Sequence, residues 1–100
     1  MKRTKKVNLV PRRRPSARYT SDDLWNAIDR VAELKGISVS RMAIRSGLDA
    51  SALNKSKRHR GGAGAHWPSM ETVSLILNAM KMDIEDFAEI VNFFANGERT

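Results

Sequence analysis

The sequence predicts an all-α fold of five helices that follows an extended basic N-terminal arm. Apolar residues recur at helical spacing in five separate stretches between positions 22 and 95. Each stretch begins after a side chain that suits a helix N-cap, and these are Thr20, Ser38, Asp49, Ser69 and Asp83. No alternation of apolar and polar residues is long enough to indicate a strand, and no internal repeat is visible.

The predicted helices are short, and their connections are shorter. The helices cover approximately 22–35, 39–46, 50–57, 70–80 and 84–95. Gly36 ends the first helix, and Gly47 is expected to end the second in the left-handed conformation that glycine adopts without a Cβ penalty. Leu48 and Leu53 are expected to anchor the turn and the third helix on the core. Two helices of about two turns each, joined by a very short turn with glycine, are typical of a helix-turn-helix motif.

Residues 1–19 hold eight Lys and Arg and no acid, and they show no helical apolar period. Pro11 and Pro15 bracket an arginine triplet, and proline disfavours helix in the residue before it. The sequence therefore predicts a flexible or extended basic arm at 1–19, a folded domain at 20–96 and a short tail at 97–100. An organellar transit peptide is the alternative for the arm, although the prolines break the amphipathic helix that it needs.

Positive charge is concentrated in two regions of the chain. The formal net charge is +7, yet residues 20–100 alone hold ten basic and eleven acidic residues. Within them, the stretch from Ser38 to His66 holds six basic residues against Asp49 alone. This asymmetry indicates a polyanionic partner, because neutralised phosphates release counterions. The alternative is charge that serves solubility alone, but such surfaces usually intersperse both signs.

The groupings of side chains that most enzymes and cofactor sites need do not stand out in the sequence. There is no cysteine, and no carboxylate pair or nucleophile–base pair stands out, so we expect no enzyme activity, no cofactor and no metal site. The glycine-rich stretch 58–66 has neither the P-loop spacing nor the dinucleotide fingerprint, and we expect a flexible loop with Trp67 as its packing anchor. The alternative for Trp67 is a residue that stacks on DNA. No apolar run approaches about 20 residues, so no membrane span is expected.

Four stretches of the sequence resemble a known family. They are "LWNAIDRVAELKGIS", "GLDASALNKSKR", "WPSMETVSLIL" and "DIEDFAEIV", within about Asp22 to Val91. These stretches, in this order along the chain, resemble the DNA-binding domain of the lambda-repressor-like (XRE/Cro) helix-turn-helix family. The resemblance is greatest to the N-terminal domain of bacterial LexA-like repressors. Val39 departs from the family, which commonly has a phosphate-binding glutamine at this position. No Ser/Lys self-cleaving domain follows in this chain, so no autoproteolysis is expected of it.

The resemblance implies where the DNA contacts lie. Base edges in the major groove would be contacted by Ala50, Ser51, Asn54 and Lys55, phosphates by Ser40, Arg41, Lys57, Arg58 and Arg60, and the minor groove or backbone by the arm residues Arg12, Arg13, Arg14 and Arg18. The Asn54 amide has the donor and the acceptor to bind adenine bidentately. The alternatives are that these residues are merely the exposed side of a short helix, and that the arm is a loose electrostatic tether.

The last predicted helix is expected to carry a contact surface. Its predicted core stripe runs through Ile84, Phe87, Ala88, Val91 and Ala95. Phe93 then falls on roughly the opposite side, with Ile90 and Phe94 beside the stripe. Grouped large apolar residues on a small domain suggest a contact surface. Members of the family that the sequence resembles often dimerise in this region. We therefore predict a homodimer through Ile90, Phe93 and Phe94, and the alternative is a monomer in which Phe93 packs against the first helix or the arm.

Together these features predict a sequence-specific, double-stranded DNA-binding transcriptional regulator of a bacterium or phage, located in the cytoplasm on the nucleoid. Repression is the expected mode, because a bound domain alone can occlude a promoter. The alternatives are an activator that contacts RNA polymerase or another regulator, an antitoxin-type module that binds a protein and autoregulates, and an RNA or general chromatin binder. The sequence indicates no effector.

Overall fold

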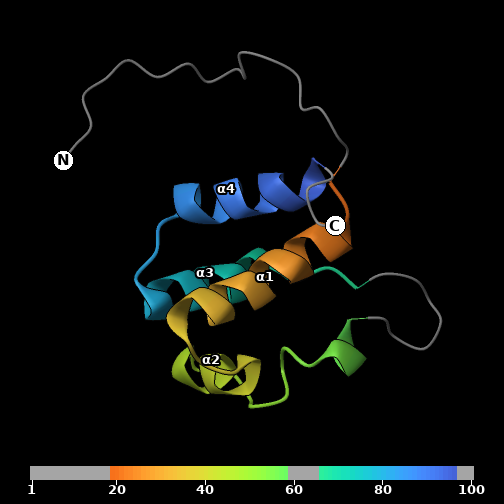
Figure 1. Cartoon of the computed structure of the whole chain (residues 1–100). Coiled ribbons are helices and arrows are strands. Elements are labelled where there is room, and N and C mark those ends of the chain that lie inside the picture. Colours follow the sequence, from red (N-terminus) through yellow and green to blue (C-terminus); the bar gives the residue numbers. More distant parts are fainter. Residues whose placement is uncertain (1–18, 59–65, 97–100) are drawn as a thin grey trace.

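The computed structural model describes residues 19–58 and 66–96. In these ranges the chain forms four α-helices, α1 (Ser21–Lys35), α2 (Val39–Arg45), α3 (Met70–Met80) and α4 (Ile84–Ala95), one 3-10 helix, η1 (Lys55–Lys57), and no strand. Figure 1 shows α4 and α2 on opposite sides of α1, with α3 behind α1. The all-α prediction is confirmed, whereas the prediction of five α-helices is wrong.

Side-chain caps begin every one of these α-helices, as the sequence predicts. The Thr20 hydroxyl accepts the Asp23 N–H at 3.2 Å, and the Asp23 carboxylate accepts the Thr20 N–H at 2.9 Å, which closes a capping box. Asp83 closes a second capping box at the start of α4. Ser38 and Ser69 accept backbone N–H groups at the starts of α2 and α3. These bonds satisfy N–H groups that have no acceptor inside the helix, so local sequence sets where each helix begins.

The end of α2 is a Schellman motif centred on Gly47. The Gly47 N–H donates to the Ile44 carbonyl at 3.0 Å, and the Leu48 N–H donates to the Ala43 carbonyl at 2.9 Å. Gly47 has a φ of 85°, in the left-handed region, which confirms its predicted role. Leu48 is half-buried and packs against the core. The chain therefore turns sharply away from α2 at this point.

One apolar core joins all four helices. Its buried side chains include Ile28 and Val31 of α1, Met42 of α2, Val73 and Ile76 of α3, and Phe87 and Val91 of α4. Leu53, in the connection between α2 and η1, is also fully buried. Burial of a leucine side chain contributes about 1.5–3 kcal/mol. Leu53 therefore attaches an otherwise polar connection to the core, as predicted.

The buried face of α4 is narrower than the predicted core stripe. Phe87, Val91 and Ala95 are buried, but Ile84 and Ala88 are exposed. The reason is that α4 packs chiefly against α1. A single neighbouring helix covers a narrower stripe than neighbours on two sides would.

Residues 50–57 do not form the predicted α-helix. The N–H groups of Ala52, Asn54 and Lys57 donate to carbonyl oxygens three residues earlier, at 3.0, 3.1 and 2.9 Å, whereas an α-helix needs acceptors four residues earlier. Asn54 has an extended backbone, with φ of −64° and ψ of 150°, between the first turn and η1. The segment is therefore a turn followed by a single 3-10 turn, and the predicted helix-turn-helix motif lacks its second α-helix.

Two causes keep this segment from forming an α-helix. Ser51 and Asn54 favour caps and turns, because their side chains compete for backbone hydrogen bonds, and a segment of this length is too short to be helical by propensity alone. In addition, the Leu53 carbonyl accepts Nη2 of Arg58 at 2.7 Å. In an α-helix that carbonyl would accept the Lys57 N–H instead. The Arg58 side chain thus supplies the Leu53 carbonyl with a hydrogen bond that does not require a helical backbone.

Residues 1–18 of the predicted arm and the whole predicted tail lie outside the described residues. So do four arginines of the arm, Arg12, Arg13, Arg14 and Arg18, and Arg60 of the glycine-rich loop. At the first described residue, the Tyr19 hydroxyl donates to Asn92 Oδ1 of α4 at 2.5 Å. The chain therefore enters the fold beside α4.

Candidate nucleic-acid interface

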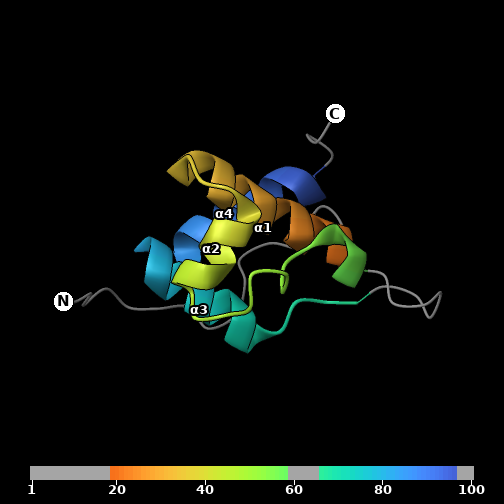
Figure 2. The ribbon, with the colours of Figure 1, turned by 90° about the horizontal axis from the view of Figure 1, so that it is seen from below.

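Opposite sides of the described fold carry opposite charge. On one side, α2 and the connection after it expose Arg41, Arg45, Lys55 and Lys57, with Asp49 as the acid among them. Figure 2 views the molecule from this side, with α2 nearest. On the far side of α1, residues 83–96 hold no Lys or Arg and the carboxylates of Asp83, Glu85, Asp86 and Glu89. A polyanion would therefore be attracted to the α2 side.

The residues predicted to contact base edges lie in the connection on this side. Ala50, Ser51, Asn54 and Lys55 are all exposed, and the side chain of Lys55 is 82% exposed. The Asn54 side chain makes no hydrogen bond to cap η1, so its amide is available to a partner. These side chains come from two successive turns and not from one helix. Their spacing therefore differs from that of a recognition helix lying in a groove.

Three of the residues predicted to bind phosphate are exposed on the same side. Ser40 and Arg41 lie in the first turn of α2, and Lys57 ends η1. Arg45, in the last turn of α2, adds a further exposed cation. The cations therefore bracket the connection that holds Asn54.

Arg58, also predicted to bind phosphate, is buried instead. Its Nη1 and Nη2 donate to Asp29 Oδ2 and Oδ1 at 3.0 and 2.8 Å, and Nη2 also donates to the Leu53 carbonyl. The guanidinium carbon lies 4.7 Å from the centroid of the Trp25 ring. Only 8% of the side chain is exposed. Arg58 is therefore not available to a phosphate in this arrangement, because its charge is already paired inside the fold.

Asp29 is the partner of Arg58 that the sequence analysis does not identify. It stands four residues after Trp25, so the two side chains lie on one face of α1. The spacing of Asp29 from Trp25 is the one feature of the sequence that could have indicated a partner for this acid. Its partner lies 29 positions further along the chain.

Trp25 joins the two ends of the glycine-rich loop to α1. Its Nε1–H donates to the His66 carbonyl at 2.7 Å, and the His66 N–H donates to the Arg58 carbonyl at 2.9 Å. Trp25 is 4% exposed, whereas Trp67, the predicted anchor, is 51% exposed. The prediction for Trp67 is therefore wrong. Trp25 anchors the loop, because it can bury its ring and still hydrogen-bond through its N–H.

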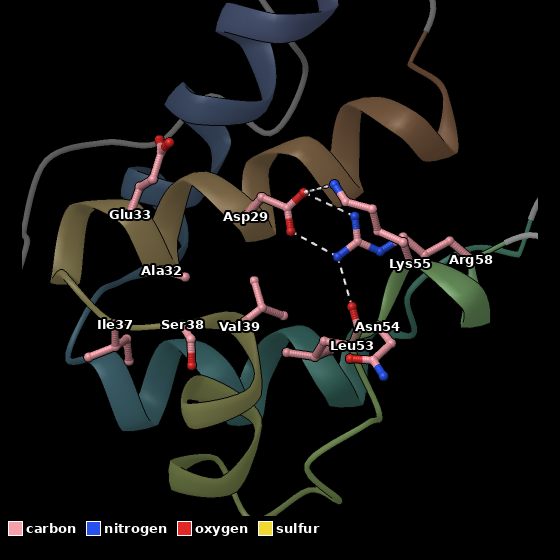
Figure 3. Close-up of a pocket in the computed structure, with 10 residues that line it drawn as sticks. All are labelled: Asp29, Ala32, Glu33, Ile37, Ser38, Val39, Leu53, Asn54, Lys55 and Arg58. Carbon is pink, nitrogen blue, oxygen red and sulfur yellow. Dashed lines mark hydrogen bonds and ion pairs between the residues drawn. The ribbon is translucent and has the colours of Figure 1, made fainter.

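A groove of about 530 Å³ lies between α1, the start of α2 and the chain around Leu53. Figure 3 shows Asp29, Lys55 and Arg58 at one end of this groove. Lys55 Nζ lies 4.0 Å from Asp29 Oδ2, at the limit of an ion pair, and is far more exposed than Arg58. Arg58 is therefore the main partner of Asp29, and the exposed Lys55 ammonium can reach an external anion.

The predicted contact surface on α4 is partly exposed. Phe93 is 50% exposed, while Ile90 and Phe94 are half-buried. The rings of Phe93 and Phe94 meet edge to face, with centroids 5.2 Å apart. Half of the Phe93 side chain thus faces outward on the helix that lies across α1 from the basic side.

The exposed groups on the basic side are ammonium, guanidinium and amide donors, which suit binding to an anion. The described residues hold no group of three or more His, Cys, Asp or Glu placed to bind a metal ion. None of the helices within 19–58 and 66–96 is long and apolar enough to cross a lipid bilayer.

Comparisons with protein-family models, with curated proteins and with solved structures found no match to this chain. The resemblance to the lambda-repressor-like family therefore rests on the four sequence stretches alone.

Proposed function

We propose that this protein is a sequence-specific, double-stranded DNA-binding transcriptional regulator. The observation that carries the proposal is the separation of charge across α1, with exposed Arg and Lys on the α2 side and carboxylates on α4. Cations of this kind neutralise phosphates, and the release of counterions supplies affinity. The resemblance of the sequence to a family of DNA-binding domains supports the same function.

In this proposal Arg41 and Lys57 bind phosphates. One lies in the first turn of α2 and the other at the end of η1, so they would hold both ends of the connection on the DNA backbone. Asn54 lies between them with an exposed amide, and it would bind adenine through N6 and N7. Ser51 would bond to a base or a phosphate, and Lys55 to guanine or the backbone.

Repression is the proposed mode of regulation, because a domain bound at a promoter blocks access to it. The protein would then act on the nucleoid in the cytoplasm. Activation through contact with RNA polymerase is the rival mode. A promoter fusion measured with and without the protein separates the two modes by the sign of the change.

We also propose a homodimer that forms through α4. Phe93 is about half exposed on the side of α4 away from the core, and Ile90 and Phe94 are half-buried near it. Because α4 lies across α1 from α2, a two-fold dimer through this surface would direct the two basic sides away from each other, so that each binds its own segment of DNA. The rival occupant of this surface is a different protein, as in an antitoxin, and that rival predicts a hetero-complex in place of a dimer.

Selection of bound sequences from random duplex DNA tests the main proposal. Asn54→Ala should then lower affinity for the selected site by about 1–3 kcal/mol and relax preference at one base pair. Lys57→Ala should weaken binding to all sequences alike and reduce the salt slope by about one. The matched control is Lys81→Ala, an exposed lysine outside α2 and the connection, which should change neither quantity. A selection that enriches no sequence, together with unchanged affinity of Lys57→Ala, would show that the proposal is wrong.

A further inference from the structure

Two large apolar side chains are exposed at the start of α3. Trp67 is 51% exposed and Met70 is 63% exposed. Single exposed apolar residues are common on protein surfaces and need no explanation. A tryptophan and a methionine three residues apart, both half exposed or more, indicate a surface that contacts a partner.

The backbone on both sides of Trp67 is fixed by hydrogen bonds. Both polar backbone groups of His66 are hydrogen-bonded, the N–H to the Arg58 carbonyl and the carbonyl to Trp25 Nε1. Pro68 restricts the chain after Trp67, and the Ser69 side chain caps α3. The indole is therefore presented from an ordered position. A rigid aromatic side chain loses little conformational entropy when it binds, which makes it an efficient contact.

The residues around Trp67 suit the binding of a polyanion that also carries flat aromatic rings. The hydrogen bond between His66 and Arg58 brings the chain at Trp67 beside the end of η1, where Lys57 is exposed. Glu71 is the nearest carboxylate along the chain, and it lies in the first turn of α3, where it complements the helix dipole. Exposed aromatic rings beside cations are the groups that bind unpaired nucleotides, since the ring stacks on a base and the cation binds the phosphate.

We propose that Trp67 stacks on an unpaired nucleobase, with Lys57 on the adjacent phosphate, so that the protein binds single-stranded DNA segments in addition to duplex. This inference rests on the proposed function for the phosphate contact of Lys57 and goes beyond it in assigning a second form of the ligand. The sites at which this matters are frayed ends, bubbles and opened promoter DNA, where bases have left the stack.

The test measures binding of fluorescein-labelled oligothymidylate and of a blunt hairpin duplex by fluorescence anisotropy at fixed salt. Trp67→Ala should weaken binding to the single strand by about 5- to 150-fold and change hairpin affinity less than 2-fold. Trp67→Phe should keep most of the single-strand affinity, because it retains a ring. The matched control is Leu34→Ala, an equally exposed large apolar residue on α1 outside the proposed sites, which should bind the oligonucleotide as wild type does.

A second measurement on the unaltered protein does not depend on how the variants fold. Trp25 is 4% exposed and Trp67 is 51% exposed, so quenching of tryptophan emission by acrylamide reports mainly on Trp67. Saturation with oligothymidylate should protect this emission from the quencher. Unchanged quenching at saturation, or Trp67→Ala binding the single strand within 2-fold of wild type, overturns the inference. If duplex binding that depends on Lys57 persists in that case, the proposed function stands without it, and if neither DNA form binds, both proposals fall.

Discussion

Replacement of Asp29 by alanine removes the acceptor of two charged hydrogen bonds from Arg58. The bonds are 2.8 and 3.0 Å long, and the Arg58 side chain that would be left behind is only 8% exposed. Loss of one partner from a buried ion pair costs about 3–5 kcal/mol, because the remaining charge is left uncompensated. Asp29 is 29% exposed, so water can reach part of the site, and the lower end of that range applies. We expect a loss of about 3 kcal/mol, which lowers the melting temperature of a domain of this size by roughly 12–24 °C.

Urea denaturation and thermal melting followed by circular dichroism measure this effect. The matched control is Glu33→Ala, which breaks the exposed pair between Arg30 and Glu33 on the same helix and should cost about 0.5 kcal/mol or less. A double-mutant cycle with Arg58→Met isolates the coupling between the two buried groups. If Asp29→Ala lowers the free energy of unfolding no more than Glu33→Ala does, the ion pair between Asp29 and Arg58 does not stabilise the fold. The burial of the Arg58 charge would then lack an explanation.

Four further perturbations follow from the same structure. Gly47→Ala should lower the free energy of unfolding by about 1 kcal/mol, because φ is 85° and no atom lies within 4 Å of the added Cβ; a loss well above 2 kcal/mol in urea melts would contradict this purely backbone origin. Lys81→Gly should raise stability by about 0.5 kcal/mol, since Lys81 has a φ of 58° at the end of α3, and a lower urea midpoint would argue against strain there. Deletion of residues 1–18 should leave the melting temperature nearly unchanged while it weakens DNA binding and flattens its salt dependence, because eight Lys and Arg lie in 1–19; a large loss of stability would mean that the arm belongs to the fold. Phe93→Glu should convert the dimer to a monomer and spare folding, because the side chain is half exposed; sedimentation of the wild type as a monomer would refute the dimer.

Helix beginnings and ends were determined by the sequence. The capping box of Thr20 and Asp23 and the left-handed turn at Gly47 involve residues within a few positions of one another. Interactions of such short range are properties of the local chain, so pattern and residue chemistry suffice to predict them. The exposed cations of α2 and η1 were predictable for the same reason, since charged side chains without a buried partner stay in water.

The width of a buried face was decided by the tertiary structure. Helical spacing places Ile84 and Ala88 on the same side of α4 as Phe87 and Val91, but α1 covers only the latter pair. Periodicity indicates the direction of the apolar face. How far that face is covered depends on the number and position of neighbouring helices, which the sequence does not state locally.

The backbone conformation of residues 50–58 also depends on tertiary contacts. Arg58 finds Asp29 across 29 positions, and Trp25 finds His66 across 41. Short-range preferences in this segment are weak, and a helix of two turns is not stable by itself. The buried guanidinium of Arg58 hydrogen-bonds Asp29 and the Leu53 carbonyl through Nη1 and Nη2, while its Nε has no partner. A contact between distant residues therefore settles the backbone where local chemistry leaves the choice nearly balanced.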